Sequence, residues 1–215
     1  MSKKHEKRQS LQVSTKGNAI FPIDPQGGGT WLGVSHFGQT LALLNDYQSV
    51  FDITAVKHSR GLLIPHLLSN KAPALYQLQN MDLSGYAPFK LCIFPDGLSI
   101  NNNNVVFVRW DAKQLIYCQV EPLATSSGVE LETVTQKRKQ QFKQLIDLTH
   151  PESEQFLAFH YNKAEQGQYG VNMLREDAMT VSISHIKVGN TIRFNYFDKQ
   201  SQLISSIGCL KVAAA

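Results

Sequence analysis

Short runs in which apolar and polar residues alternate recur along the chain. Alternation over roughly four to eight residues is typical of β-strands that bury one face. The runs predicted as strands are residues 18–23, 30–34, 39–44, 89–94, 105–110, 114–120, 180–186 and 191–196. Turn-forming residues at 35–38, 111–113 and 188–190 join three pairs of these runs, which are therefore predicted as β-hairpins.

Other segments carry apolar residues at helical spacing. Residues 59–69 and 72–81 are predicted as consecutive helices, the second with Pro73 in its first turn. Residues 130–148 form the longest predicted helix, and residues 153–160 form a short one. Hairpins interrupted by paired helices predict an antiparallel α+β fold built in layers.

The 215 residues show no internal repeat and no linker, so one domain over residues 1–215 is expected. Hydrophobic residues make up 42% of the chain and charged residues 18%, a composition typical of globular proteins. Residues 1–17 are polar and show no periodic pattern. We expect them to be poorly ordered or to form an atypical N-terminus.

The formal net charge is +4, and a basic cluster near the N-terminus contributes much of it. No aromatic residue precedes Phe21, so the cluster lacks a surface on which bases could stack, and nucleic acid is not expected as a partner. No stretch approaches the roughly 20 apolar residues that span a bilayer, so no membrane span is expected. Three cysteines without a CxxC pair indicate a reducing compartment, and we expect a cytoplasmic protein.

Motifs with a defined chemistry are few. The glycine-rich residues 26–30 precede a strand instead of the helix that a phosphate-binding loop requires, so a tight turn explains them better. The seven histidines include no pair at the spacing of a helical metal site, and no metal is expected. Ser126 and Ser127 precede a predicted helix, where they could cap it or contact an anion. Ser2 could act as an N-terminal nucleophile only inside a cleft, which the charged residues around it do not favour.

Four further blocks follow one another along the chain: Gly28-Gly29-Thr30-Trp31-Leu32-Gly33-Val34, Leu43-Leu44-Asn45-Asp46-Tyr47, Ser59-Arg60-Gly61-Leu62-Leu63 and Arg175-Glu176-Asp177-Ala178-Met179-Thr180-Val181-Ser182. Together they resemble the NRDE family, also called the transport and Golgi organization protein 2 family, in its bacterial form. The resemblance runs from about Ile20 to Tyr196. It implies an αββα sandwich of antiparallel sheets of the N-terminal nucleophile hydrolase type.

Members of this family usually begin Met-Cys and carry an Asn-Arg-Asp-Glu motif. In relatives with hydrolase chemistry the cysteine attacks an amide, and the arginine and aspartate flank it. Here Lys3-Lys4-His5-Glu6 stands in place of the motif, and only Glu6 matches. Cys92, Cys118 and Cys209 cannot replace the nucleophile, because the chemistry needs a thiol and an α-amine on one residue. No catalytic residue is therefore predicted.

The first hypothesis is a catalytically silent family member that binds a small or apolar ligand. The resemblance makes haem handling a specific form of it, so haem is a candidate although no cofactor is required. The predicted ligand-binding residues are Gly29, Thr30, Trp31, Asn45, Ser126 and Arg175. The alternative is an amidohydrolase acting on non-peptide C–N bonds, whose N-terminal cysteine lies upstream of Met1. A third hypothesis is an interaction module that uses the basic N-terminus.

The resemblance also bears on assembly. A sheet without the family's first strand would expose an edge on which another chain could pair. A homo-oligomer is therefore a further expectation.

Overall fold

Two antiparallel sheets organise the part of the chain that the structure, a computed structural model, describes: residues 12–25, 27–69, 71–99, 102–162, 167–176, 178–198 and 202–212. The larger sheet is a meander of seven strands, each paired with the next along the chain: β1 (Gln12–Lys16), β2 (Ala19–Ile23), β3 (Leu32–Ser35), β4 (Thr40–Asn45), β5 (Phe89–Phe94), β6 (Val106–Trp110) and β7 (Leu115–Cys118). The smaller sheet has the order β10-β9-β8, formed by β8 (Ser182–Val188), β9 (Thr191–Asp198) and β10 (Leu203–Leu210). Of the basic cluster near the N-terminus, Lys3, Lys4, Lys7 and Arg8 lie outside the described residues, and Lys16 ends β1.

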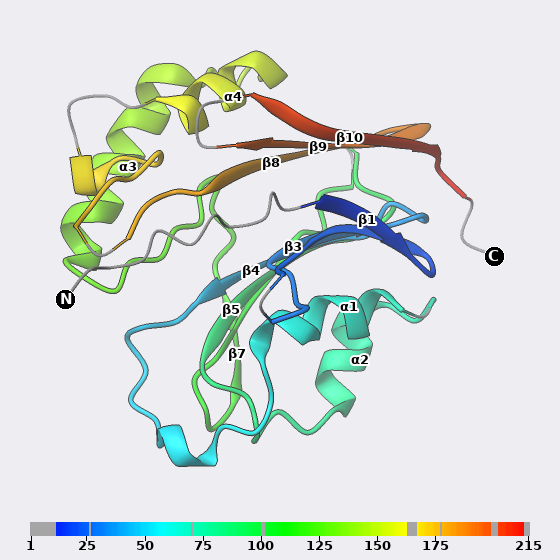
Figure 1. Cartoon of the computed structure of the whole chain (residues 1–215), viewed down its shortest axis with the longest axis vertical. Coiled ribbons are helices and arrows are strands. Elements are labelled where there is room, and N and C mark those ends of the chain that lie inside the picture. Colours follow the sequence, from blue (N-terminus) through cyan, green and yellow to red (C-terminus); the bar gives the residue numbers. More distant parts are fainter. Residues whose placement is uncertain are drawn as a thin grey trace.

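Helices lie on both outer sides of the stacked sheets (Figure 1). A 3₁₀ turn, η2 (Arg60–Leu62), runs into α1 (Leu63–Leu68), which is followed by α2 (Ala74–Asn80). Both helices cover the seven-stranded sheet on the side away from the smaller sheet. On the opposite side, beside β8, lie α3 (Leu131–Leu145) and α4 (Ser153–Tyr161), with the short 3₁₀ helix η3 (Gly167–Tyr169) against α3. The remaining 3₁₀ turn is η1 (Ile53–Ala55).

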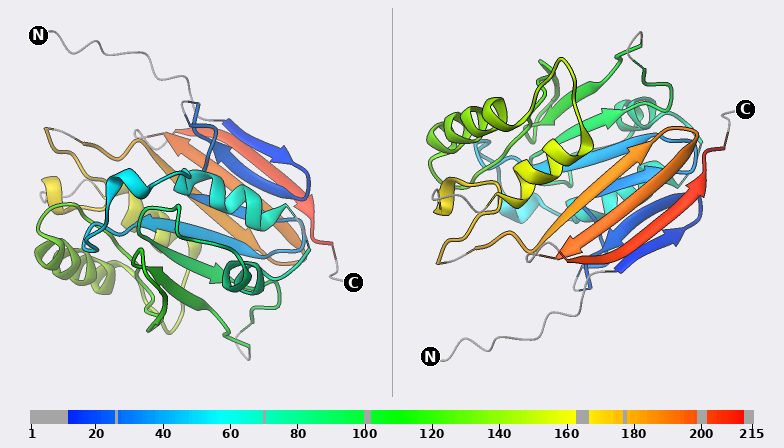
Figure 2. Two further views of the ribbon diagram at one scale, coloured as in Figure 1. Left: turned by 90° about the horizontal axis from the view of Figure 1, so that it is seen from below. Right: turned by 90° about the horizontal axis from the view of Figure 1, so that it is seen from above.

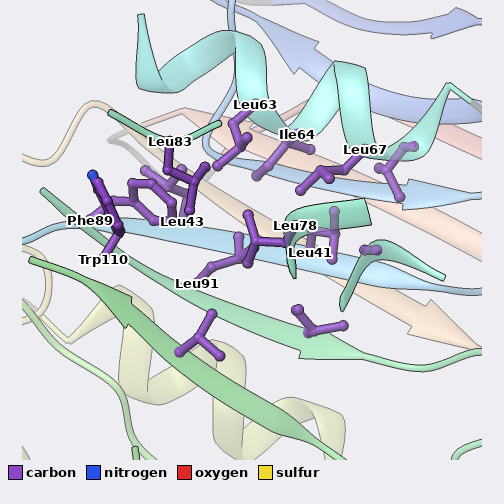
Figure 3. Close-up of a cluster of buried hydrophobic side chains, with 14 of the residues drawn as sticks. Leu41, Leu43, Leu63, Ile64, Leu67, Leu78, Leu83, Phe89, Leu91 and Trp110 are labelled. Atoms are coloured by element: carbon purple, nitrogen blue, oxygen red, sulfur yellow. The ribbon is translucent and has the colours of Figure 1, made fainter. Parts of the chain in front are cut away.

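The largest hydrophobic core fills the space between the seven-stranded sheet and the helices α1 and α2 (Figure 3). Alternate residues of β5 point into it, because successive side chains of a strand face opposite sides. The side of α1 that faces the sheet carries four fully buried residues: Leu63, Ile64, Leu67 and Leu68. Gly33 lets α1 approach β3, since a Cβ there would stand 3.0 Å from Leu68 Cδ1 and 3.1 Å from Ile64 Cγ2.

A second core lies between the two sheets. Its buried members come from β2, β3 and β9: Ile20, Val34, Ile192, Phe194 and Tyr196. The smaller sheet thus packs on the β2–β3 part of the seven-stranded sheet, whereas β6 and β7 lie beyond its edge (Figure 2, right). The same face of β5, β6 and β7 is consequently only half-buried, and this matters for the ligand site below.

A third, smaller core joins α3 to α4 and to the loops beside them. Phe142, Ile146 and Phe159 are buried in it, and the rings of Phe142 and Phe159 meet edge to face with centroids 5.3 Å apart. No helix among the described residues is long and apolar enough to cross a membrane.

Each predicted strand and helix corresponds to an element of the structure, and the α+β fold with antiparallel sheets is confirmed. Boundaries differ by a few residues. The helix predicted over residues 59–69 begins as the 3₁₀ turn η2, and that over 130–148 ends at Leu145.

Two strands were not predicted. β1 lies within residues 12–16, where no apolar alternation marks a strand, and it pairs antiparallel with β2 from Gln12↔Ile23 to Lys16↔Ala19. β10 is rich in small residues and is held by its ladder with β9. Both are edge strands, so their conformation depends on a neighbour more than on their own sequence.

Candidate functional site

Gly29 makes a close backbone contact with Gly61 of η2. The Thr30 amide nitrogen donates a hydrogen bond of 2.7 Å to the Gly61 carbonyl oxygen, and a Cβ on Gly29 would stand 2.6 Å from the Gly61 carbonyl carbon. A side chain at position 29 therefore has no room. The glycines of two separate sequence blocks meet here, and their contact explains them as structural residues.

Thr30 and Trp31 order the entry to β3. Thr30 is buried, and its Oγ1 donates to the Leu32 carbonyl oxygen at 3.0 Å. The Trp31 carbonyl oxygen accepts a hydrogen bond of 2.8 Å from the Leu43 amide, and the Trp31 ring packs against the core between the sheets. The hydrogen bonds of Thr30 and Trp31 thus hold the start of β3 in place beside β4.

Asn45, the last residue of β4, lies next to a tyrosine that joins the sheet to a distant loop. Asn45 Nδ2 donates to the Tyr47 hydroxyl at 2.9 Å. The Tyr47 ring lies against Gly128, where an added Cβ would be 3.8 Å from Tyr47 Cγ. The end of β4 therefore adjoins the loop that contains Ser126.

Arg138 of α3 connects this loop to the end of η3 through hydrogen bonds. Its guanidinium donates to the Tyr169 and Gly170 carbonyl oxygens at 3.2 and 3.0 Å, and to Thr125 Oγ1 and the Ser126 carbonyl oxygen at 2.6 and 3.4 Å. All four acceptors are neutral oxygens.

The charge of a second arginine, Arg175, acts on Arg138. Burial lowers the pKa of Arg138, and the like charge of Arg175 lowers it further. Ser126 and Arg175, two of the predicted ligand-binding residues, thus come together around an arginine that sequence reasoning did not select. Gly29 and Thr30 instead contact Gly61, and Trp31 packs against the core between the sheets.

A buried carboxylate next to Asn45 was also missed. The Asp46 side chain is 1% exposed, and its Oδ2 accepts a hydrogen bond of 2.6 Å from Arg109 Nε on β6, in an ion pair. Ser49 Oγ donates to the same oxygen at 2.6 Å and accepts from Arg109 Nη2 at 2.8 Å. Burial alone would raise the pKa of Asp46, but the hydrogen bonds from Ser49, Arg109 and the Gln48 amide outweigh it and lower the pKa. The only signal for this cluster was Asp46 itself, within a family-like block, because 63 residues separate it from Arg109.

Two of the half-buried histidines lie elsewhere, His160 on α4 and His185 on β8. His160 Nδ1 is 2.8 Å from the Phe156 carbonyl oxygen, and His185 Nδ1 is buried without a hydrogen-bond partner among the described residues. Burial is the main cause that lowers the pKa of each, and the charge of His160 adds to the effect on His185. No group of three or more His, Cys, Asp or Glu side chains within the described ranges is placed to hold a metal ion.

A shallow groove of about 410 Å³ lies on the helical side, between α2 and the β6–β7 hairpin. Leu78, Met81, Trp110 and Tyr117 are among its lining residues. None of the six predicted ligand-binding residues lines it, and the arginines described above lie elsewhere.

Comparison with known proteins identifies a family. The family model described as Transport and Golgi organisation 2 matches residues 5–183, most of the chain. No curated protein matches the chain significantly.

Proposed function

Because the chain belongs to the Transport and Golgi organisation 2 family, we propose that it is a catalytically silent member that binds a small anionic molecule. The proposal includes an N-terminal nucleophile hydrolase-like αββα sandwich as its fold. Two stacked antiparallel sheets with helices on both outer sides support that part of it.

The proposal is carried by Arg138 and Arg175. The half-buried Arg138 guanidinium has only neutral oxygens as hydrogen-bond partners among the described residues, and its burial carries a cost in free energy that an anion would offset. Arginine also matches the planar, two-oxygen geometry of carboxylate and phosphate groups. A ligand with such a group fits the end of β4 beside Ser126 and Asn45.

The thiols support binding without hydrolysis. Burial raises the pKa of the Cys92 thiol to about 11, so this group is not a thiolate at neutral pH. Cys92, Cys118 and Cys209 form no disulfide, which supports the cytoplasm as the proposed location.

Haem is a less well supported ligand. The arginines would suit its carboxylates, but iron also needs an axial ligand. The recorded contacts of His160 are with Phe156, Phe159 and His185, between α4 and β8 and not with the arginines. The described contacts therefore place no histidine at Arg138 and Arg175 to ligate the iron, and the proposal does not depend on haem.

The test compares anionic and neutral probes. Succinate and inorganic phosphate are titrated against the protein, with succinamide as the neutral match, and thermal unfolding is followed. A ligand at a hundred times its Kd should stabilise the fold by about 2.7 kcal/mol. Arg175→Ala should weaken anion binding about tenfold, since it removes one charge-assisted contact, and should leave the fold intact.

Arg193→Ala is the matched control, because Arg193 is exposed on β9. Its binding should equal that of the wild type. An unchanged affinity in Arg175→Ala, or equal effects of succinate and succinamide, would contradict the proposal.

An amidohydrolase with its cysteine upstream remains the second candidate, and one observation favours it. Gln12 at the start of β1 pairs with Ile23, and Trp31 and Asn45 lie at the same end of the sheet. The start of β1 therefore lies at the end of the sheet that carries Asn45. The intact mass of the protein from its native host decides between the candidates: about 24.1 kDa supports binding alone, whereas a larger mass with an N-terminal cysteine supports the hydrolase.

A further inference from the structure

Lys90 of β5 and Arg109 of β6 stand directly opposite each other in the seven-stranded sheet. Their neighbours Phe89, Leu91 and Val108 are buried against the helices, so Lys90 and Arg109 face the other way. The smaller sheet packs on β1, β2 and β3 of this face, and the side chains of Lys90 and Arg109 are half-buried on it.

The pair of cations is flanked by apolar groups. Leu44 pairs with Lys90 and Ile116 with Arg109, so each charge has an aliphatic neighbour on its outer side. The next row on the same face is also apolar and half-buried, and consists of Ala42, Cys92, Phe107 and Cys118. The two cations of Lys90 and Arg109 thus lie next to an apolar row that crosses the four strands β4 to β7, called the apolar strip below.

Arg109 is held in a fixed orientation. Its Nε and Nη2 donate to Asp46 and Ser49, whereas Nη1 has no hydrogen-bond partner among the described residues. Asp46 is buried and balances only one of the two positive charges. The ammonium group of Lys90 makes no ion pair with any residue that the structure describes.

Like charges directly opposite on neighbouring strands destabilise a sheet unless something compensates them. An oxyanion between Lys90 Nζ and Arg109 Nη1 would compensate both charges. The arginine would orient it through a directional hydrogen bond, and the lysine would attract it as a point charge. We propose that Lys90 and Arg109 bind the oxyanion head of an amphipathic small molecule whose apolar body lies along Cys92 and Phe107. The inference goes beyond the proposed function: it adds a second anion site, apart from Arg138 and Arg175, and names its ligand as an anion with a hydrocarbon body.

Decanoate is the probe, used below the concentration at which it forms micelles, with binding measured by titration calorimetry. Decanoate should bind with a negative heat-capacity change, because apolar surface is buried. Acetate, which has the head alone, and decanol, which has the body alone, should bind more weakly. Any tighter or equal binding of acetate or decanol would overturn the inference.

Lys90→Met tests the head-binding site. It keeps the aliphatic stem and removes the charge, so decanoate should bind about tenfold more weakly while unfolding stays cooperative. Lys113→Met, at the exposed turn between β6 and β7, is the matched control and should bind as the wild type does. Wild-type affinity in Lys90→Met would remove this site.

Phe107→Leu tests the apolar strip in the same way. Because it shortens the apolar surface without touching either cation, it should weaken decanoate but not acetate. An unchanged decanoate affinity would show that the hydrocarbon body lies elsewhere and would overturn this part of the inference.

Arg175→Ala separates this inference from the proposed function. Weaker succinate binding in Arg175→Ala, together with wild-type decanoate binding in Lys90→Met, would leave the proposed function standing and overturn the present inference. The converse pattern would remove Arg175 from the ligand site and keep Lys90 and Arg109.

Discussion

The backbones of Gly29 and Gly61 touch where the entry to β3 meets the turn that leads into α1. A Cβ on Gly29 would lie 2.6 Å from the carbonyl carbon and 2.7 Å from the Cα of Gly61, and no side-chain rotation can relieve a clash with backbone. This contact fixes α1 to the sheet and thereby sets the position of Thr30 and Trp31.

Gly29→Ala is therefore expected to destabilise the fold by roughly 1–3 kcal/mol or more, because the backbones must move apart. Urea denaturation measures the change as a lower midpoint with an unchanged slope. Gly189→Ala is the matched control, since the nearest atom to its added Cβ is 4.0 Å away. It should change stability by less than about 0.5 kcal/mol, and an equal loss in both variants would refute the clash.

The carboxylate of Asp46 should make stability depend on acid pH. Its pKa in the folded protein lies below the ordinary 3.8, since hydrogen bonds to the ionised form outweigh burial. The unfolded state therefore binds the proton more readily. The stabilisation from Asp46 is fully present above pH 3.8 and is lost as the pH falls through the lower pKa of the folded protein.

Asp46→Asn should accordingly cost about 1–3 kcal/mol at neutral pH and much less in strong acid. Denaturant unfolding of wild type and variant at about pH 7 and at successively lower pH down to about 2 measures both differences. Glu132→Gln, an exposed change on α3, is the control and should cost little at either pH. A cost for Asp46→Asn that does not vary with pH would contradict the role of its charge.

Gln141 of α3 offers a stabilising substitution. It is 3% exposed, and neither amide atom has a hydrogen-bond partner in the part of the chain that the structure describes. A buried, unpaired amide costs free energy, so Gln141→Leu should raise the free energy of unfolding by about 1–2 kcal/mol. Gln140→Leu, its exposed neighbour, should not. A lower free energy of unfolding in Gln141→Leu would contradict the cost assigned to the unpaired amide.

His160 should reduce stability in mild acid. Burial holds its folded pKa below the ordinary 6.5, so the unfolded state takes up the proton first. Stability should then decline as the pH falls below 6.5. His160→Gln should flatten this decline, whereas His150→Gln should not, because the His150 side chain is 87% exposed. Parallel pH profiles for wild type and His160→Gln would contradict this assignment.

Part of the fold could be predicted because it rests on local periodicity. The strand predicted at residues 89–94 is β5 without change, and the turn at residues 111–113 joins β6 to β7. Each pattern lies within one run of residues, where alternation reflects a buried and a less buried face. β1 and β10 could not be predicted in this way, because their conformation comes from the strands beside them.

The candidate site was predictable only in part. Asn45, Ser126 and Arg175 were selected, and the structure brings all three to one region. Arg138 was not among the predicted site residues, although its guanidinium joins two loops. Whether a charged helical residue faces solvent or a neighbouring loop depends on packing that the helix's own sequence does not encode.

The sequence by itself determined the alternating strands, the helices between them and the glycines of the family-like blocks. Only the tertiary structure decided that Gly29 meets Gly61, that Asp46 pairs with Arg109 and that Lys90 stands beside Arg109. The physical reason is range: hydrophobic periodicity acts within a few residues, whereas strand register and burial bring together groups that lie far apart in the chain.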